Sequence, residues 1–356
     1  MPETISTKGC NIHFNEEGFV QLNAYIQNTQ PSGIFVLVDE NTHEYCLPFF
    51  LSQIVTEITI EIIEIESGEE NKNIHTCTGV WEALSELGAN RKSLMINLGG
   101  GVITDLGGFV AATFMRGMAF INVPTTLLAM VDASVGGKTG IDLGMLKNQV
   151  GVIQLPAMVL INTLLLESLP ARQIRSGFTE MLKHGLIYDR EHWEKLKGID
   201  LTNHAIPVEL IHESITIKNK VVTLDPYEKG LRKILNFGHT LGHAIESYLL
   251  QNENRETLLH GEAIAIGIIL ESFLSSKTTN LSEQETKEIK DVFLSWFDKI
   301  VFTEKEIAEI IEFMKYDKKN AYGRINFVML EKTGKAQIDH QASHSLIQQA
   351  FQFYLT

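Results

Sequence analysis

The sequence is poor in cysteine, and its few cysteines form no metal-binding or redox pattern. Cys10, Cys46 and Cys77 are an odd number, and no two of them have CxxC spacing. A disulfide framework is therefore not expected, and the chain is predicted to work in the reducing cytoplasm. Residues 1–4 carry neither a charged region nor an apolar stretch, so no secretory signal is predicted.

Positive charge and long apolar segments are also scarce. There are 30 Lys and Arg residues against 44 Asp and Glu, the formal net charge is -14, and the cations form no basic run. Duplex binding needs clustered cations that displace counterions from phosphates, so nucleic acid is not an expected partner. No window reaches the roughly 18 uninterrupted apolar residues of a membrane span, so no membrane association is expected. Any bound anion must be held by a few well-placed cations.

The first half of the chain alternates strand and helix patterns. An apolar run at 34–38 ends in Asp39, as a buried parallel strand does, and residues 58–66 alternate Ile with Thr and Glu. A helical segment at 80–87 follows. Further strands are predicted at 94–98, 120–123 and 158–161. This alternation predicts an α/β domain with a Rossmann-like, doubly wound sheet.

The second half is dominated by amphipathic helical patterns, and 325–330 is its single segment with an extended pattern. The predicted helices are 171–188, 208–222, 240–250, 261–274, 283–296 and 304–314. Thr303 and Glu306 predict a capping box for the last of them. With 356 residues, and roughly 100–200 residues per domain, two domains are expected. We place an α/β domain at 1–165 and a mainly α-helical domain at 166–356, with the active site in the cleft between them.

Two glycine clusters are candidate anion sites. Gly99-Gly100-Gly101 lies between a predicted strand and a predicted helix, where backbone N–H groups can approach a phosphate. The alternative is a tight turn that needs positive φ. The second cluster, residues 135–140, lacks the GxxxxGK[ST] spacing, so a P-loop is rejected. Lys138 within it still suggests an anion site, which Lys147 and Asn148 could extend.

Histidine and glutamate form the most informative pattern. His239 and His243 are four residues apart and would share one helix face, and His260 opens the next helix. Glu180 lies on an earlier helix, with Lys183 and His184 three and four residues later. One carboxylate and two imidazoles are typical of a catalytic metal site. Spacing leaves open whether His184 or His243 is the second ligand, and Glu180 could instead form only a helix-surface pair.

Taken in order, the motifs of this chain resemble those of 3-dehydroquinate synthases. The matching segments are 68–72, 99–109, 114–117, 124–129, 131–140, 169–172, 180–183, 232–246 and 260–263. The resemblance implies a metal, zinc or alternatively cobalt, held by Glu180, His239 and His260. It implies NAD along Asp39, Glu69, Lys72, Gly100, Gly101, Asp105, Thr125, Thr126, Lys138 and Lys147. It implies substrate contacts from Asp132, Lys138, Lys147, Asn148, Lys183, Lys218, Arg232, Asn236, His243 and Lys318 (or Lys319), with Arg116 reaching the phosphate across a homodimer interface.

The implied reaction belongs to the shikimate pathway of aromatic amino acid biosynthesis. In it, 3-deoxy-D-arabino-heptulosonate 7-phosphate is oxidised by NAD at C5, loses phosphate by β-elimination, is reduced again and closes to 3-dehydroquinate by an intramolecular aldol step. Such a lyase must clamp a phosphate and a carboxylate, and the planar fork of Arg232 suits the carboxylate.

Three rival functions are weighed against this one. Cyclases of glucose 6-phosphate or sedoheptulose 7-phosphate have no carboxylate to bind, so Arg232 argues against them. A metal-dependent polyol dehydrogenase would release NADH. A non-catalytic ligand-binding relative would have no use for a complete set of site residues.

The chain departs from the family pattern at several places. These are Asp142-Leu143, residues 150–154, Phe178-Thr179 and residues 225–228. They affect the expected shape of the pocket and of the lid, but none removes a proposed metal ligand.

Overall fold

The computed structural model describes residues 2–7, 9–144, 146–201, 206–314 and 325–356. The chain divides into two compact units, which we treat one at a time. Unit 1 contains Met1–Ile174 and Pro207–Asn219, and unit 2 contains Arg175–Ile206 and Lys220–Thr356. Our domain border at 165 stays a prediction; the units change at 174, and a later segment returns to unit 1.

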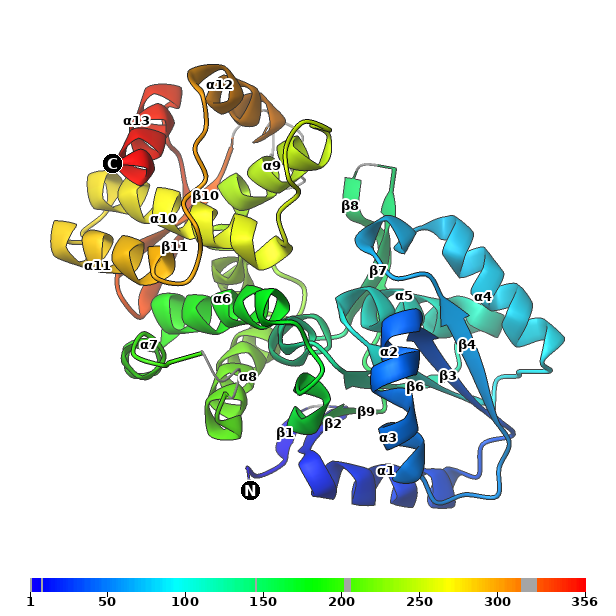
Figure 1. Ribbon diagram of the computed structural model, residues 1–356. Coiled ribbons are helices and arrows are strands. Elements are labelled where there is room, and N and C mark those ends of the chain that lie inside the picture. Colours follow the sequence, from blue (N-terminus) through cyan, green and yellow to red (C-terminus); the bar gives the residue numbers. More distant parts are fainter. Residues whose placement is uncertain (1, 8, 145, 202–205, 315–324) are drawn as a thin grey trace. The chain divides into compact units, whose positions relative to one another are not determined.

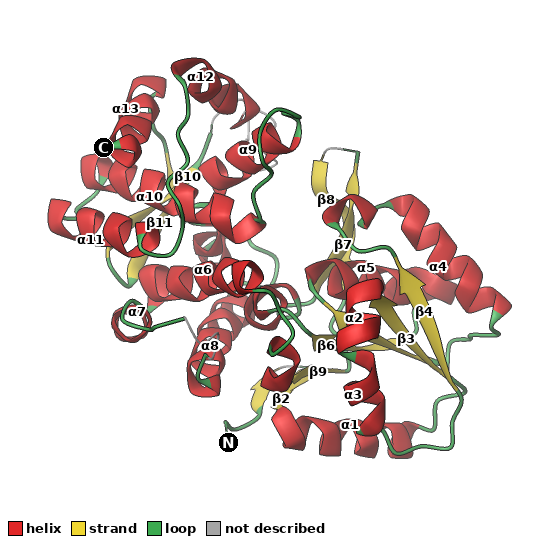
Figure 2. Ribbon diagram, in the orientation of Figure 1, coloured by secondary structure: helices red, strands yellow, loops and turns green. Residues whose placement is uncertain are grey.

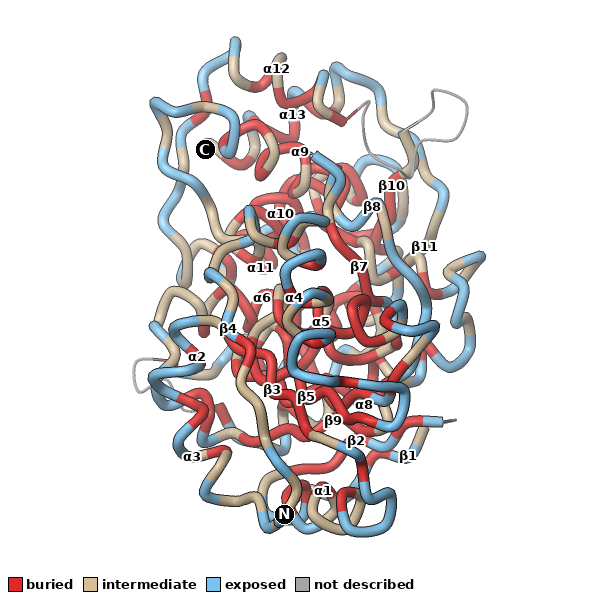
Figure 3. The backbone as a smooth tube through the Cα atoms, turned by 90° about the vertical axis from the view of Figure 1, so that its right-hand side faces the viewer, coloured by how far each residue is buried: buried red, intermediate tan, exposed pale blue. Residues whose placement is uncertain are grey.

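Unit 1 is built on a seven-stranded sheet in the order β1-β2-β9-β6-β5-β3-β4 (Figure 1). Its strands are β1 (Ile5–Thr7), β2 (Cys10–Phe14), β3 (Ile34–Asp39), β4 (Ile60–Ile65), β5 (Leu94–Gly99), β6 (Ala119–Pro124) and β9 (Met158–Ile161). All neighbours pair in parallel except β1 with β2. Apolar runs at 34–38 and 94–98 form the two strands that Figure 3 shows buried along almost their whole length. The predicted doubly wound sheet is confirmed.

Helices cover this sheet, and a hairpin extends from it (Figure 2). The helices are α1 (Asn15–Thr29), α2 (Glu40–Tyr45), α3 (Leu47–Ser52), α4 (Ile74–Glu86) and α5 (Gly101–Thr113). Apolar side chains of α4 and α5, among them Val80 and Leu106, share one core with Leu37 and Met95 of the strands. The hairpin consists of β7 (Lys138–Leu143) and β8 (Leu146–Ile153), which pair antiparallel. Short turns lie at η1 (Glu69–Asn71), η2 (Phe114–Arg116), η3 (Ala129–Ala133) and η4 (Thr163–Leu166).

Unit 2 is mainly helical, as predicted. Its helices are α6 (Ala171–Tyr188) and α8 (Val208–Leu224), which both begin in unit 1, α7 (Arg190–Leu196), α9 (His239–Leu250), α10 (His260–Thr278), α11 (Glu283–Leu294), α12 (Glu304–Phe313) and α13 (His344–Leu355), with the turn η5 (Leu231–Asn236). The capping box of α12 is confirmed, because Thr303 and Glu306 exchange both bonds. Across the described residues, no helix combines the length and the apolar character needed to cross a membrane.

The prediction of a single extended segment in the second half was wrong. The strand β10 (Phe327–Lys332) pairs antiparallel with β11 (Lys335–His340). The sequence of β11, KAQIDH, is mostly polar; Ala336 and Ile338 alternate with polar residues, but the side chains are all exposed or half-buried. A strand of this kind is stabilised by backbone pairing and leaves little trace in a hydrophobic pattern.

Candidate active site

The first glycine cluster forms the turn from β5 into α5. Gly99 ends the strand, Gly100 caps the helix and Gly101 opens it. None of the three has a positive φ, so the tight-turn alternative fails. Gly99 and Gly100 are needed for space: a Cβ on Gly99 would lie 2.4 Å from Cγ1 of Ile103, and one on Gly100 would lie 3.0 Å from Cγ2 of Thr126, whereas one on Gly101 would make an ordinary contact with Ala133 at 3.5 Å. The helix N-terminus carries no side-chain cap, which is the geometry that suits a phosphate.

Several predicted cofactor residues lie at the carboxyl ends of neighbouring parallel strands. Asp39 ends β3 and caps α2, accepting from the backbone N–H of Thr42 at 2.8 Å. Thr125 follows β6 and donates its N–H to the carbonyl of Gly99 at 3.0 Å, and Thr126 is next to it. Dinucleotides bind at this edge of open α/β sheets.

A cluster of charged residues surrounds the buried Lys72 in unit 1. Its Nζ lies 2.7 Å from Oδ2 of Asp105 and 3.8 Å from Oε1 of Glu69. Burial lowers the pKa of Lys72, but the carboxylates of Asp105 and Glu69 more than offset this, so the net pKa is raised and the lysine is charged at neutral pH. The backbone N–H of Asp142 donates to the carbonyl of Lys72 at 2.8 Å. Asp142, noted as a departure from the family pattern, therefore belongs to this cluster.

The β7–β8 hairpin carries three of the predicted substrate residues. Lys138 is exposed at the start of β7, directly after Gly136 and Gly137, whose φ angles are 106° and 70°. Asn148 also has positive φ, 51°, and donates its N–H to Oδ1 of Asp142 at 2.5 Å. Lys147 precedes it and is half-buried.

Asp132 and Lys218 form an ion pair in unit 1. Asp132 lies on η3, a single turn of π-type helix, and Lys218 lies on α8. The Lys218 ammonium donates to both the carboxylate and the backbone carbonyl of Asp132. Turns of π type are frequent at functional sites, and here one places a carboxylate beside a lysine that is only 5% exposed.

Arg116 lies on an exposed and strained turn after α5. Met115 and Arg116 have φ angles of 49° and 69°, both in the left-handed region, and Gly117 follows at 116°. Such conformations cost about 1–3 kcal/mol for residues other than glycine and cluster at functional sites. The Arg116 side chain is exposed to solvent.

In unit 2 the predicted metal ligands converge. Glu180 lies on α6 and is fully buried. Its Oε1 lies 3.6 Å from Nε2 of His239, at the start of α9, and 4.0 Å from Nε2 of His260, at the start of α10. Three elements separated along the chain thus bring one carboxylate oxygen and two imidazole nitrogens together, which is the donor set expected for zinc or cobalt.

His243 joins the same cluster. Its ring centroid lies 5.1 Å from that of His239 and 5.6 Å from that of His260. The three histidines each offer a nitrogen within 4.8 Å of the others'. Distances alone therefore allow His243 as a ligand or as a neighbour of the ion. Lys183, one turn after Glu180 on α6, is buried and forms an ion pair with it.

Glycine at position 267 lets α10 pack closely against the start of α9. A Cβ on Gly267 would lie 2.0 Å from the carbonyl oxygen of Gly238, so only glycine fits there. Glu271 of α10 accepts from the N–H of Gly238 at 2.7 Å and of Leu241 at 3.2 Å. It thus supplies from another helix both bonds of a capping box that α9 lacks. These two hydrogen bonds hold the first turn of α9, which carries His239, in place.

Arg232 and Asn236 lie on a turn organised by two acids. Asp225 accepts from the N–H groups of Lys229, Gly230 and Arg232 at 3.0, 2.7 and 3.1 Å. These bonds, that from Gly230 foremost, lower the pKa of the Asp225 carboxyl. Asn236 donates to Glu228 at 2.6 Å, and Arg232, which is buried, donates to the carbonyl of Pro226 at 2.7 Å. Lys318 and Lys319 lie outside the described residues.

The sequence reasoning assigned no role to Glu246 or Glu271. Glu246 lies seven residues after His239, so the face it shares with the two histidines of α9 could have been read from spacing. Glu271 acts across helices, and no local pattern marks it.

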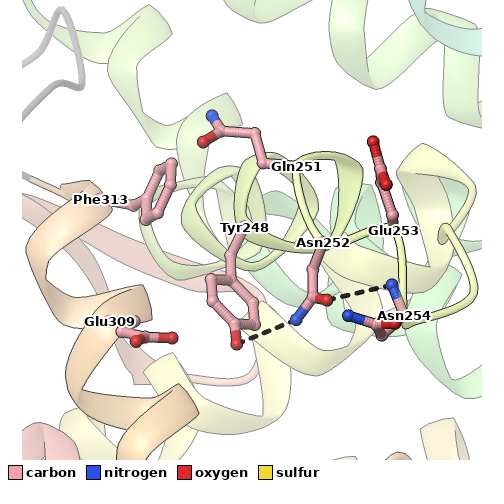
Figure 4. Close-up of a pocket in the computed structure, with 7 residues that line it drawn as sticks. All are labelled: Tyr248, Gln251, Asn252, Glu253, Asn254, Glu309 and Phe313. Atoms are coloured by element: carbon pink, nitrogen blue, oxygen red, sulfur yellow. Dashed lines mark hydrogen bonds between the residues drawn. The ribbon is translucent and has the colours of Figure 1, made fainter.

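A pocket of about 420 Å³ lies at the opposite end of α9 (Figure 4). Tyr248, Gln251, Asn252, Glu253, Asn254, Glu309 and Phe313 line it. Asn252 donates to the Tyr248 hydroxyl at 3.3 Å and accepts from the N–H of Asn254 at 3.2 Å. Among the described residues, none that we predict to bind cofactor, metal or substrate lines this pocket.

Solved structures with the same fold include several cyclases. A 2-deoxy-scyllo-inosose synthase complexed with carbaglucose-6-phosphate, NAD+ and Co2+ is 26% identical, with a TM-score of 0.85 over 98% of this chain and 99% of that one. A 2-epi-5-epi-valiolone synthase from Streptomyces hygroscopicus, with NAD+ and Zn2+ bound, has a TM-score of 0.85 over 100% of this chain and 99% of that one. At 22% identity, the second likeness shows the fold alone.

Sequence comparisons are more specific. The chain matches the family models of the 3-dehydroquinate synthase N-terminal region over residues 62–176 and C-terminal region over 177–320. It is 39% identical to the 3-dehydroquinate synthase of Parabacteroides distasonis, covering 94% of each chain. It is 38% identical to that of Halalkalibacterium halodurans, covering 96% of this chain and 95% of the relative. The chain therefore belongs to the 3-dehydroquinate synthase family.

Proposed function

We propose that this chain is a 3-dehydroquinate synthase, an NAD- and metal-dependent lyase that converts 3-deoxy-D-arabino-heptulosonate 7-phosphate into 3-dehydroquinate and phosphate. The observation that carries the proposal is the convergence of His239 and His260 on Glu180, whose Oε1 lies 3.6 and 4.0 Å from their Nε2 atoms. Family membership and the strand-end cofactor residues support it. A homodimer in the cytoplasm, with Arg116 reaching a second subunit, is part of the same proposal.

The residues of unit 2 fit a divalent metal. Two imidazoles and a fully buried carboxylate would hold zinc or cobalt and leave positions open for substrate. In unit 1, Gly100, Gly101, Thr125 and Thr126 would hold the pyrophosphate of NAD, and the Lys72 cluster would position the nucleotide. When bound, NAD supplies reversible hydride acceptance and the metal supplies Lewis-acid polarisation of a substrate oxygen.

The remaining residues would bind an open-chain substrate that has a carboxylate at one end and a phosphate at the other. Arg232 offers a planar fork of donors to the carboxylate, and the acids at 225 and 228 hold its turn in place. Lys138, Lys183 and His243 would bind the phosphate. Holding both ends of the substrate brings the carbon atoms of the aldol step together, which lowers its entropic cost.

Arg232 also favours this substrate over the nearest alternative. Glucose 6-phosphate has no carboxylate, so a cyclase acting on it would have no substrate carboxylate for the donor fork of Arg232 to bind. A polyol dehydrogenase would accumulate NADH.

The test is incubation of the metal-loaded protein with NAD and the heptulosonate phosphate. We expect inorganic phosphate to be released in proportion to 3-dehydroquinate, with no net absorbance of NADH at 340 nm. Net NADH would instead indicate a dehydrogenase. Equal turnover of glucose 6-phosphate would contradict the assigned substrate.

A further inference from the structure

We propose that Glu246 is a positioning residue that fixes the tautomer and orientation of His260 for metal binding. This rests on the proposed metal site, and adds to it a residue that is not itself a ligand. Glu246 lies on α9, and His260 opens α10. The role follows from what faces each nitrogen of the His260 ring.

The ring of His260 lies between two carboxylates. Its Nδ1 is 3.5 Å from Oε2 of Glu246, and its Nε2 is 4.0 Å from Oε1 of Glu180. Glu246 is only 8% exposed, so its charge is poorly screened by solvent. The imidazole therefore has an acceptor on one side and the proposed metal position on the other.

A neutral imidazole carries its proton on one nitrogen and offers a lone pair on the other. An ionised carboxylate only accepts hydrogen bonds, so Glu246 favours a proton on Nδ1. The lone pair is then on Nε2, on the side of Glu180. The 3.5 Å separation is longer than the roughly 2.7–3.2 Å of an ordinary N–H···O hydrogen bond, so in this structure the two groups are close but not hydrogen-bonded. Metal binding, which makes Nδ1–H a stronger donor, is expected to shorten it.

His239 is oriented by a different group with the same result. Its Nδ1 lies 3.1 Å from the backbone carbonyl of Phe237, which again leaves Nε2 toward Glu180. Both imidazoles thus point Nε2 toward Glu180. The acceptor that faces Nδ1 is a backbone carbonyl for His239 and a side-chain carboxylate for His260. Of these two acceptors, only the Glu246 carboxylate can be removed by substitution.

The spacing along α9 lets one helix carry both the histidines near the proposed metal position and the carboxylate that orients His260. His239, His243 and Glu246 are at positions i, i+4 and i+7, so they share a face. Glu246 therefore lies beside the histidines while its carboxylate reaches across to α10. Acceptors of this kind, placed behind a ligand, typically change metal affinity about 10- to 100-fold when removed.

The test compares metal affinity in Glu246→Gln with a charge-matched control. Glu253→Gln removes one carboxylate from an exposed position just after the same helix. Zinc dissociation constants are measured by competition with a chelator, and the visible absorption of the cobalt-loaded proteins reports ligand geometry. The neutral Gln amide is a weaker acceptor than the carboxylate and can also turn its NH2 group toward the ring. We therefore expect Glu246→Gln to bind zinc about 10- to 100-fold more weakly and to shift the cobalt spectrum. Glu253→Gln should match the wild type.

Further measurements separate positioning from folding and from the proposed function itself. A merely structural Glu246 would lower the Tm of the metal-free protein without changing its zinc affinity, and that result would overturn the proposal. Glu246→Asp, which keeps the charge, should bind zinc more tightly than Glu246→Gln; equal affinities would also overturn it. If the wild type binds no zinc, the proposed metal site fails. If the wild type binds zinc and Glu246→Gln binds it equally well, only the role of Glu246 fails.

Discussion

Arg232 is the residue on which substrate choice is expected to depend. Charge-assisted hydrogen bonds contribute about 1.5–3 kcal/mol. Arg232→Ala should therefore raise the KM for the heptulosonate phosphate by roughly 10- to 150-fold, and leave the Kd for NAD unchanged. Steady-state kinetics and NAD titration measure the two effects. Lys233→Ala is the control, because this neighbour forms only a partly exposed pair with Asp339 at 3.1 Å. An unchanged KM in Arg232→Ala would remove its carboxylate role.

His260 is expected to be indispensable for metal retention. His260→Ala removes one of the two imidazoles that face Glu180, so elemental analysis should find no stoichiometric metal after dialysis. His340→Ala is the matched control in the same unit, since His340 contacts Gln337 at 2.9 Å and belongs to the β10–β11 pair. Full metal occupancy in the His260 variant would show that the ligands have been assigned wrongly.

How much of the site could be predicted differs from residue to residue. The spacing of His239 and His243 indicated a ligand pair, but only the family resemblance selected Glu180, His239 and His260. The structure brings all three together, as that choice requires. Glu271 could not be predicted, because it caps α9 from another helix and its partners are backbone N–H groups.

The same substitution at two helical glycines should have opposite effects on stability. In α10, a Cβ on Gly267 would overlap the Gly238 carbonyl, so Gly267→Ala should destabilise unit 2 by about 1–3 kcal/mol. In α4, no atom of the described residues outside the helix's own backbone lies within 4 Å of a Cβ on Gly79, and Gly79→Ala should stabilise the helix by up to about 1 kcal/mol. Urea unfolding measures both. Two changes of equal sign would contradict the packing argument.

Helices and strands could be predicted where burial of the element produces a recognisable pattern of apolar residues along the sequence. The helix α6 has the predicted bounds, and β9 matches residue for residue. The hairpin β7–β8 had no such signal, because β8 is largely exposed and its sequence, LKNQVGVI, does not alternate cleanly. Exposed strands depend on backbone pairing, which a hydrophobic pattern does not record.

The return of residues 207–219 to unit 1 gives a prediction for the whole molecule. Ile211 and Ile215 of α8 are fully buried, and the ring of His212 lies 5.1 Å from that of Phe14. A fragment of residues 1–174 should therefore lack a cooperative thermal transition by circular dichroism. A chain in which a flexible linker replaces residues 175–206 and that ends at 219 should regain the transition. Cooperative unfolding of the shorter fragment would show that α8 is dispensable for unit 1.

This discontinuity also affects the stage of synthesis at which each unit can fold. On the ribosome, residues 175–206 of unit 2 emerge before residues 207–219, which complete unit 1. Unit 1 therefore cannot be completed before the first segment of unit 2 has been translated. Until residues 207–219 have been synthesised, the surface around Phe14 of unit 1 stays uncovered, although residues 175–206 of unit 2 have already been translated.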